Sequence, residues 1–316
     1  MRRKDMDSKQ GDMARFIIGR AARGIVTLWI VVTCVFVVLR LSGDPAQAML
    51  GPEATPEALA AFRLRYGLND PIPVQYVRYM GNVLQGDFGQ SLQSHRPASD
   101  LFLARVAATL QLGIAAIALA LIIGVPLGVL AAVHRNSVLD RAAMGIAFIG
   151  QSAPNFFVGI VLILVLSLRF NLLPSSGRGT WQQMVMPAVT LATGLLAILA
   201  RMSRSSLLEV LGQDYVRTAR AKGLTPRRVI ISHCLRNAAI PVITIFGISI
   251  GALIGGAAIT ETVFAWPGVG RLTVNAISTR DYPVIQLIVI AVAATVVLAN
   301  LAVDITYGLL DPRIRR

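Results

Sequence analysis

Charge is scarce in this sequence. Only 15% of its 316 residues are charged, 55% are apolar, and the mean hydropathy is +0.65. A soluble globular domain normally has about 25% charged residues, so this composition predicts a membrane protein. Cysteine is also rare. Cys34 and Cys234 lie in dissimilar segments, and we predict neither a disulfide nor a cysteine metal site.

The motifs of several chemistries are missing. The sequence has no GxxxxGK[ST] phosphate loop, no HExxH, no paired CxxC and no plausible Ser/His/Asp set. His95, His134 and His233 are scattered, which favours solvated or capping histidines over metal ligands. We therefore expect no catalytic residue, no metal and no cofactor in this chain, and energy from ATP would have to enter through another protein.

Six long runs contain no Asp, Glu, Lys or Arg. Five of them are long enough to cross a bilayer core of about 30 Å, and the first, which is marginal, reaches that length with Ala21 and Ala22 while Arg20 and Arg23 extend to the headgroups. The Gly and Pro residues inside the runs are tolerated in membrane helices. We therefore predict an all-α polytopic membrane protein with six transmembrane helices. A cleaved signal peptide is the alternative for the first run, but no small-residue cleavage site follows it before Arg40. The runs are Gly24–Leu39, Val106–Val133, Ala142–Leu168, Gly179–Ala200, Asn237–Thr260 and Tyr282–Val303.

The basic residues indicate the orientation. Placing the amino terminus inside puts twenty of the thirty Lys and Arg residues on the cytoplasmic side, as the positive-inside rule favours. This topology also explains the net charge of +14 without nucleic acid as a partner. We predict a bacterial inner-membrane protein with both termini cytoplasmic: a cytoplasmic segment 1–23, then one transmembrane domain 24–316 with a periplasmic cap 41–104 and a cytoplasmic segment 201–236. Trp266 is expected at the level of the lipid headgroups.

The predicted cap is rich in Pro, Gly and polar residues. Thr55 resembles a helix start, Ala58–Arg65 is expected to form an amphipathic helix, and Gly67 is expected to end it. Pro71 and Pro73 then predict a turn or an extended path.

The segment 201–236 alternates charge with apolar residues at helical spacing, so we expect it to fold. Asp214 is a candidate cap for a helix over Tyr215–Lys222. Gly223 suits the left-handed position after that helix, and Thr225 with Pro226 suits the start of the next one. The pattern predicts a helix, a tight break and a second helix.

Basic and small residues are mixed in the first of these helices. Ala219 and Ala221 would allow the backbone of a partner to approach closely, with Arg217, Arg220 and Lys222 as flanking charges. This is typical of a protein docking element. A basic amphipathic helix that rests on anionic lipid has the same composition. Composition alone therefore does not distinguish protein docking from lipid binding.

At this point the sequence resembles a known family. DYVRTARAKG at 214–223 and LRNAAIP at 235–241 are similar to the cytoplasmic coupling loop of binding-protein-dependent ABC permeases, in the dipeptide, oligopeptide and nickel branch. Further similar stretches are GDP at 43–45, YGL at 66–68, GDFGQS at 86–91, ATLQLG at 108–113, ETVFAWPGVGRL at 261–272 and LLDPRIR at 309–315.

The resemblance implies an ATP-driven importer whose coupling helix, residues 214–223, docks on an ATPase. The implied partners are a second homologous permease, two cytoplasmic ATP-binding subunits and an external solute-binding protein. Peptide, glutathione, nickel and metal chelates all stay open as the solute. Arg217, Thr218 and Ala219 stand where the general motif has Glu-Ala-Ala, so the glutamate's role has no counterpart. The implied coupling residues are Asp214, Tyr215, Arg217, Ala219, Arg220, Lys222 and Gly223.

A few uncharged polar residues lie inside the runs. They are candidates for the solute path, and hydrogen bonding between helices is an equally good explanation. An ion-coupled carrier is the rival function, but it usually has ionisable residues deep in its spans. A channel is a further alternative, although it would not need a docking segment. The candidate path residues are Gln111, Gln151, Ser152, Asn155 and Asn300.

The topology can be tested with single cysteines. An impermeant maleimide added from outside should label cysteines introduced at Ser94 and Ser176 but not at Ser137 or Ser205, because the first two lie in predicted external segments. Labelling in the reverse pattern would show that the orientation is wrong.

Overall fold

The computed structural model describes residues 2–41, 45–51 and 53–310. They are almost entirely helical, and the β contact that they include is one isolated bridge between Gln90 and Pro97. The predicted all-α class is therefore confirmed. The chain divides into two compact units whose boundaries fall inside helices α5 and α13: a first unit of residues 1–106 and 272–316, and a second unit of Ala107–Arg271.

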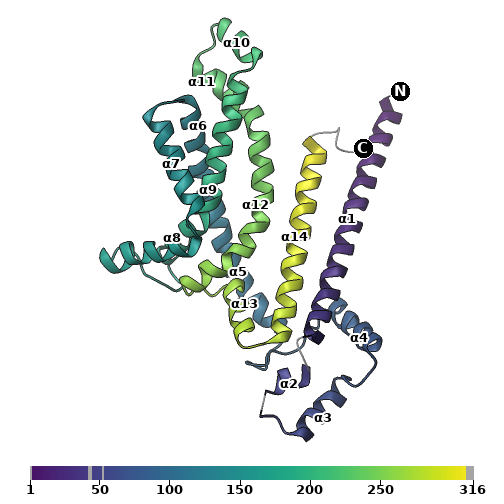
Figure 1. The fold of residues 1–316 in the computed structure, drawn as a ribbon. Helices are drawn as coiled ribbons and strands as arrows, with labels where there is room; N and C mark the ends of the chain where they lie inside the picture. The colour runs from purple at the N-terminus through teal and green to yellow at the C-terminus, as the bar shows by residue number, and fades with distance from the viewer. Residues whose placement is uncertain (1, 42–44, 52, 311–316) are drawn as a thin grey trace. The chain divides into compact units, whose positions relative to one another are not determined.

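The first unit contains the long helices α1, Arg2–Leu41, and α14, Tyr282–Leu310, which pack side by side (Figure 1). A Cβ atom at Gly24 would lie 2.7 Å from a methyl group of Val297, so glycine allows this close approach. Three short helices, α2 (Pro45–Leu50), α3 (Pro56–Arg65) and α4 (Ile72–Leu84), lie within the predicted cap.

Helix α3 confirms that the predicted cap helix forms, but it buries none of its residues and is not amphipathic as predicted. The Thr55 hydroxyl accepts a hydrogen bond from the Ala58 amide at 3.2 Å, and Gly67 follows the helix with φ of +60°. Pro71 is extended, as predicted, but Pro73 lies in the first turn of α4, where its missing N–H costs no hydrogen bond. The prediction of a turn or extended path there was therefore wrong beyond Pro71.

Aromatic contacts hold α4 against α1. The ring of Phe36 lies 5.3 Å from that of Tyr76 and 5.4 Å from that of Tyr79, and the hydroxyls of Thr33 and Tyr76 are 2.8 Å apart. Burial, with a smaller contribution from Tyr76, raises the pKa of Tyr79 to about 12. Tyr79 therefore stays neutral at physiological pH and packs as an aromatic side chain.

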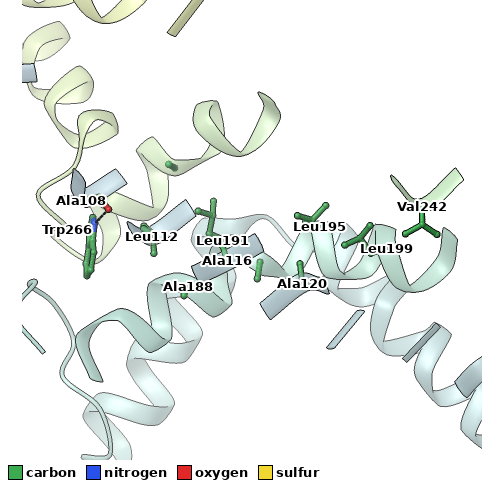
Figure 2. Packing of buried hydrophobic residues seen from close by; sticks show 12 residues of the cluster. Ala108, Leu112, Ala116, Ala120, Ala188, Leu191, Leu195, Leu199, Val242 and Trp266 are labelled. Atoms are coloured by element: carbon green, nitrogen blue, oxygen red, sulfur yellow. Dashed lines mark hydrogen bonds between the residues drawn. The ribbon is translucent and has the colours of Figure 1, made fainter. Parts of the chain in front are cut away.

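The second unit is organised around α9, Trp181–Leu211. Packed against it are π-helix η1, Ala120–Gly124, and the helices α6 (Val125–Val133), α7 (Val138–Ser152), α8 (Asn155–Leu162) and α12 (Leu235–Val263). Helix α5, Ala98–Leu119, contributes to the same core, which consists largely of alanine and leucine (Figure 2). The remaining elements are η2 (Ile163–Arg169), α10 (Asp214–Ala221), α11 (Pro226–Arg228), η3 (Val229–Cys234) and α13 (Val269–Ser278).

Four helical stretches of the described residues are long and apolar enough to span a membrane, and a bent pair gives a possible fifth. The pair consists of α7 and of α8 with its continuation η2, and the two parts meet at 106° around Pro154. Ala153 is extended there, because the residue before proline disfavours the helical region. Helix α12 covers the fifth predicted run, and the count of six stays a prediction. The four stretches are Ile17–Val38, Ala98–Val133, Trp181–Leu211 and Tyr282–Leu301.

A buried ion pair joins α7 to α9. The Arg204 guanidinium donates to both oxygens of Asp140 at 2.6 and 2.8 Å, and the Asn136 amide donates to the same carboxylate at 3.0 Å. Asp140 is only 3% exposed. Loss of one partner would leave the other charge buried without compensation, which makes this contact an anchor between the two helices.

Small residues set the distance between α6 and α9. A Cβ atom at Gly128 would overlap the carbonyl oxygen of Ala200, whereas one at Gly113 would meet nothing. We predict that Gly128→Ala lowers the stability of the detergent-purified protein by about 1–3 kcal/mol, the usual cost of overpacking. Gly113→Ala is the control and should melt like the wild type. Equal melting temperatures for both variants would contradict this packing.

Candidate functional site

The predicted coupling segment forms a short helix, α10, between two long ones. Its N-cap is Gln213, which is extended, while Asp214 is the first helical residue. The prediction that Asp214 caps the helix was therefore wrong by one position. The Asp214 carboxylate instead lies 3.5 Å from the Arg217 guanidinium, and both side chains are exposed. A carboxylate in the first turn also interacts favourably with the helix dipole.

Gly223 ends α10 in the conformation that the sequence predicts. Its φ is +80°, its amide donates to the Arg220 carbonyl at 2.9 Å, and the Leu224 amide donates to the Ala219 carbonyl at 3.3 Å. These two bonds define a Schellman motif. No atom lies near the position of an added Cβ, so only the backbone conformation opposes a side chain at Gly223.

The inner face of α10 packs against its own chain. Val216 and Ala219 are buried in a cluster with Leu207 of α9 and with Val229 and Cys234 of η3. The prediction that Ala219 presents a small surface to a partner was therefore wrong: it lets α10 approach its own neighbours. Burial also raises the pKa of the Cys234 thiol.

The outer face of α10 is polar and mostly basic. Tyr215 is 40% exposed, and its hydroxyl accepts a hydrogen bond from the Asn237 carboxamide of α12 at 2.8 Å. The predicted second helix begins at Pro226, after Thr225, and runs through α11 and η3 into α12. Figure 1 shows α10 and α11 at one end of α9 and α12. The exposed predicted residues are Asp214, Tyr215, Arg217, Arg220, Lys222 and Gly223.

The candidate path residues lie at three places. Gln151 and Ser152, at the end of α7, are exposed and Asn155, at the start of α8, is half-buried, so all three flank the bend at Pro154. Asn300 is exposed on α14, in the other unit. Gln111 is exposed on α5.

Gln111 has a charged partner that the sequence did not predict. Nε and Nη2 of Arg178 donate to the Gln111 side-chain oxygen at 3.1 and 3.0 Å. The Arg178 guanidinium also lies 5.9 Å from the centre of the Trp266 ring, within cation–π range. Arg178 stands 67 positions from Gln111 and lies between two uncharged runs, so spacing along the chain gave no signal for this contact.

Trp266 is buried inside the protein. It is 1% exposed, and its indole nitrogen donates to the Ala108 carbonyl at 2.9 Å (Figure 2). Helix α5 thus supplies the acceptor that a buried indole needs, and the predicted level of Trp266 in the membrane stays a prediction.

Glu261 is also fully buried, with its charge surrounded by donors. Its carboxylate accepts from the Thr109 hydroxyl at 2.7 Å and from the Arg271 amide at 2.9 Å, while the Thr109 oxygen accepts from the Val269 amide at 2.8 Å. A Cβ at Gly268 would overlap the carboxylate. The stretches ATLQLG and ETVFAWPGVGRL, far apart in sequence, thus meet around one carboxylate.

Comparisons with known proteins agree with this architecture. Residues 124–316 match the family model described as "Binding-protein-dependent transport system inner membrane component", and residues 13–113 match its N-terminal companion. The chain is 42% identical to the dipeptide transport system permease protein DppB of Escherichia coli K12, over 96% of this chain and 99% of DppB. It is also 42% identical to the glutathione transport system permease protein GsiC of Salmonella paratyphi A, with the same coverage.

A solved structure shares the fold. An inward-facing form of the MetNI methionine ABC transporter aligns with a TM-score of 0.51 and 22% sequence identity, over 65% of this chain and 96% of that one. At this level of identity the likeness concerns the arrangement of helices alone.

The inward position of Ala219 gives a sharp test. Ala219→Asp places a carboxylate in an apolar cluster and should destabilise the protein by about 2 kcal/mol or more. Ala221→Asp, on the exposed side of the same helix, should have little effect. Abundance in the membrane and thermal melting of the purified proteins measure the difference. Wild-type stability of the Ala219 variant would show that the cluster does not enclose this position.

Proposed function

Because this chain belongs to the family of binding-protein-dependent transport system inner membrane components and is thus a permease subunit of an ABC importer, we propose that it moves a peptide-like or chelated small solute into the bacterial cytoplasm. Relatives named for dipeptide and glutathione transport support this class of solute.

We propose α10 as the coupling helix that docks on an ATP-binding subunit. The observation that carries this proposal is that α10 buries Val216 and Ala219 inside its own chain. A helix that rests on lipid inserts its apolar face into the bilayer. The apolar face of α10 instead packs against α9 and η3 of its own chain. What it offers outward is a rigid basic surface, which suits a protein groove of complementary charge better than a membrane.

The attachment of α10 suits the transmission of motion. Val216 packs with Leu207 of α9, and Tyr215 bonds to Asn237 of α12. A displacement of α10 would therefore act on the ends of both long helices, and shifts of packed helices are a common form of conformational switching. ATP hydrolysis would occur in the partner, and this chain would turn the resulting movement into opening and closing of the path.

The proposed assembly has four further components: a second homologous permease, two ATP-binding subunits and an external solute-binding protein. Both termini and α10 would lie in the cytoplasm, as the basic residues indicate. The path would be lined in part by Gln111, Gln151, Ser152, Asn155 and Asn300.

An ion-coupled carrier fits the buried carboxylates less well. Asp140 is held by the Arg204 guanidinium, and Glu261 accepts hydrogen bonds from a hydroxyl and from backbone amides. Both groups are held in place by these contacts, and only Asp140 is paired with a cation among the described residues. A carrier would require a carboxylate that exchanges its cation during each cycle.

The coupling proposal predicts a selective effect at Gly223. Gly223→Val forces a β-branched residue into a left-handed conformation at a cost of about 1–2 kcal/mol, which should misplace α10 and lower uptake about fivefold or more. Uptake should be measured in the assembled importer, together with the amount of ATPase that co-purifies with the permease.

Gly86→Val is a matched control. Gly86 has φ of +74°, follows α4 and has no atom near its added Cβ, so the backbone strain is alike. It should leave ATPase retention unchanged. The double variant Arg220→Gln with Lys222→Gln tests the lipid alternative: a larger loss from this pair than from Gly223→Val, with normal ATPase retention in the latter, would refute the docking assignment.

A further inference from the structure

Arg178 is an exposed cation, and several of its N–H groups are available as hydrogen-bond donors. A guanidinium carries five N–H groups, and the contact with Gln111 engages Nε and Nη2 on a single oxygen. Among the described residues, no carboxylate forms an ion pair with Arg178. Because the Gln111 oxygen faces the guanidinium, the exposed end of its carboxamide is the NH₂ group, which also donates. The two side chains therefore combine one positive charge with a set of hydrogen-bond donors.

The segment that carries Arg178 is held on both sides. The Gly177 amide donates to the Phe264 carbonyl at 3.1 Å. The Gln183 side chain accepts from the Thr180 amide at 3.0 Å and donates to the Ser176 carbonyl at 3.1 Å. The Trp266 ring, fixed by its own bond to α5, lies beneath the guanidinium. Arg178 is thus positioned before any ligand arrives, which lowers the entropy cost of binding.

The depth of Gln111 favours a small ligand. It lies on α5 inside the uncharged run 106–133, five residues or about 8 Å from the start of that run at Val106. Ionisable groups within a membrane span normally face the bundle interior or a water-filled space, and the contact with Gln111 brings the Arg178 guanidinium to this run. A side chain of a docked soluble protein would have to reach this depth, whereas a solute entering the path arrives there.

We propose that Arg178 and Gln111 form a carboxylate-binding subsite at the outer part of the solute path. It would take the free carboxylate of a peptide-like or chelated solute through charge-assisted hydrogen bonds from the guanidinium, supported by the Gln111 amide. The Trp266 ring, which contacts the Arg178 guanidinium, and the hydrogen bonds around Glu261 would keep the subsite in place. This proposal rests on the proposed function, because it assigns the solute's carboxylate a place in the path.

Direct binding tests the subsite without transport. The assembled importer in lipid nanodiscs, without its external binding protein, would be titrated by saturation-transfer NMR with acetyl-dialanine and with acetyl-dialanine amide. The carboxylate probe should bind the wild type at least tenfold more tightly than the amide. Arg178→Gln should remove this difference, and Arg178→Lys, which keeps the charge but not the planar fork, should retain part of it.

Two further variants keep the result interpretable. Arg169→Gln removes an exposed arginine from the other end of the same segment and should bind both probes like the wild type. Gln111→Leu keeps the guanidinium and should weaken the binding of acetyl-dialanine but not that of its amide. ATPase activity of each assembly confirms that it is folded. Equal binding of the two probes to the wild type, or an unchanged preference in Arg178→Gln, would overturn the subsite.

Two more measurements separate the possible failures. Uptake of labelled dialanine by the wild-type importer with its binding protein tests the proposed function. If uptake is absent while the carboxylate preference depends on Arg178, the proposed subsite is supported and the proposal of a peptide-like solute is wrong. If Arg178→Gln weakens the affinity of the binding protein and leaves the preference for acetyl-dialanine unchanged, Arg178 contacts that protein and the subsite is wrong.

Discussion

Close approach between helices is the constraint on which the second unit depends. In a bilayer, apolar side chains gain little by leaving lipid for protein, so helices associate through tight packing and specific polar contacts. Helix α9 meets this requirement with small partners. Added Cβ atoms at Gly124 and Gly128 would collide with the backbone of α9 at Leu196 and Ala200. These two glycines therefore set how closely η1 and α6 approach α9, the helix with which most elements of this unit pack.

Polar contacts then fix the register between neighbouring helices, which small residues do not determine. Apolar surfaces let helices slide, whereas a bidentate ion pair such as Arg204 with Asp140 permits one register. Glu261 has a similar role near the C-terminal end of α12, where its carboxyl group accepts hydrogen bonds from Thr109 of α5 and from the start of α13. A buried charge is costly unless fully paired, which explains why each of these carboxylates accepts several hydrogen bonds.

Local rules predicted local structure well. Gly223, Thr55 and the helix break after α10 were predicted because backbone conformation and capping depend on a few adjacent residues. Helix boundaries were less accurate: α9 continues to Leu211 inside the predicted cytoplasmic segment, since charged residues do not end a helix that packs on one face. The 106° bend at Pro154 also exceeds what an uncharged run alone indicates.

The candidate site needed tertiary structure. Ala219 was expected to face a partner and instead faces inward, because which side of a helix is covered depends on neighbours distant in sequence. The contact of Arg178 with Gln111 joins positions 67 residues apart and has no periodic signature. Motif resemblance identified the stretches that matter, but it did not reveal that two of them surround one carboxylate.

Helix α12 links the two functional regions of the second unit. Asn237 near its start bonds to Tyr215 of α10, and Glu261 near its end supports the Trp266 segment beneath Arg178. These residues are 24 positions apart, about 36 Å along a helix. The proposed ATPase contact and the proposed carboxylate subsite therefore share one element, and a shift of α12 caused by α10 would be felt at the residues that hold Arg178. A two-state displacement of this helix is the physical form that coupling between solute and ATP would take here.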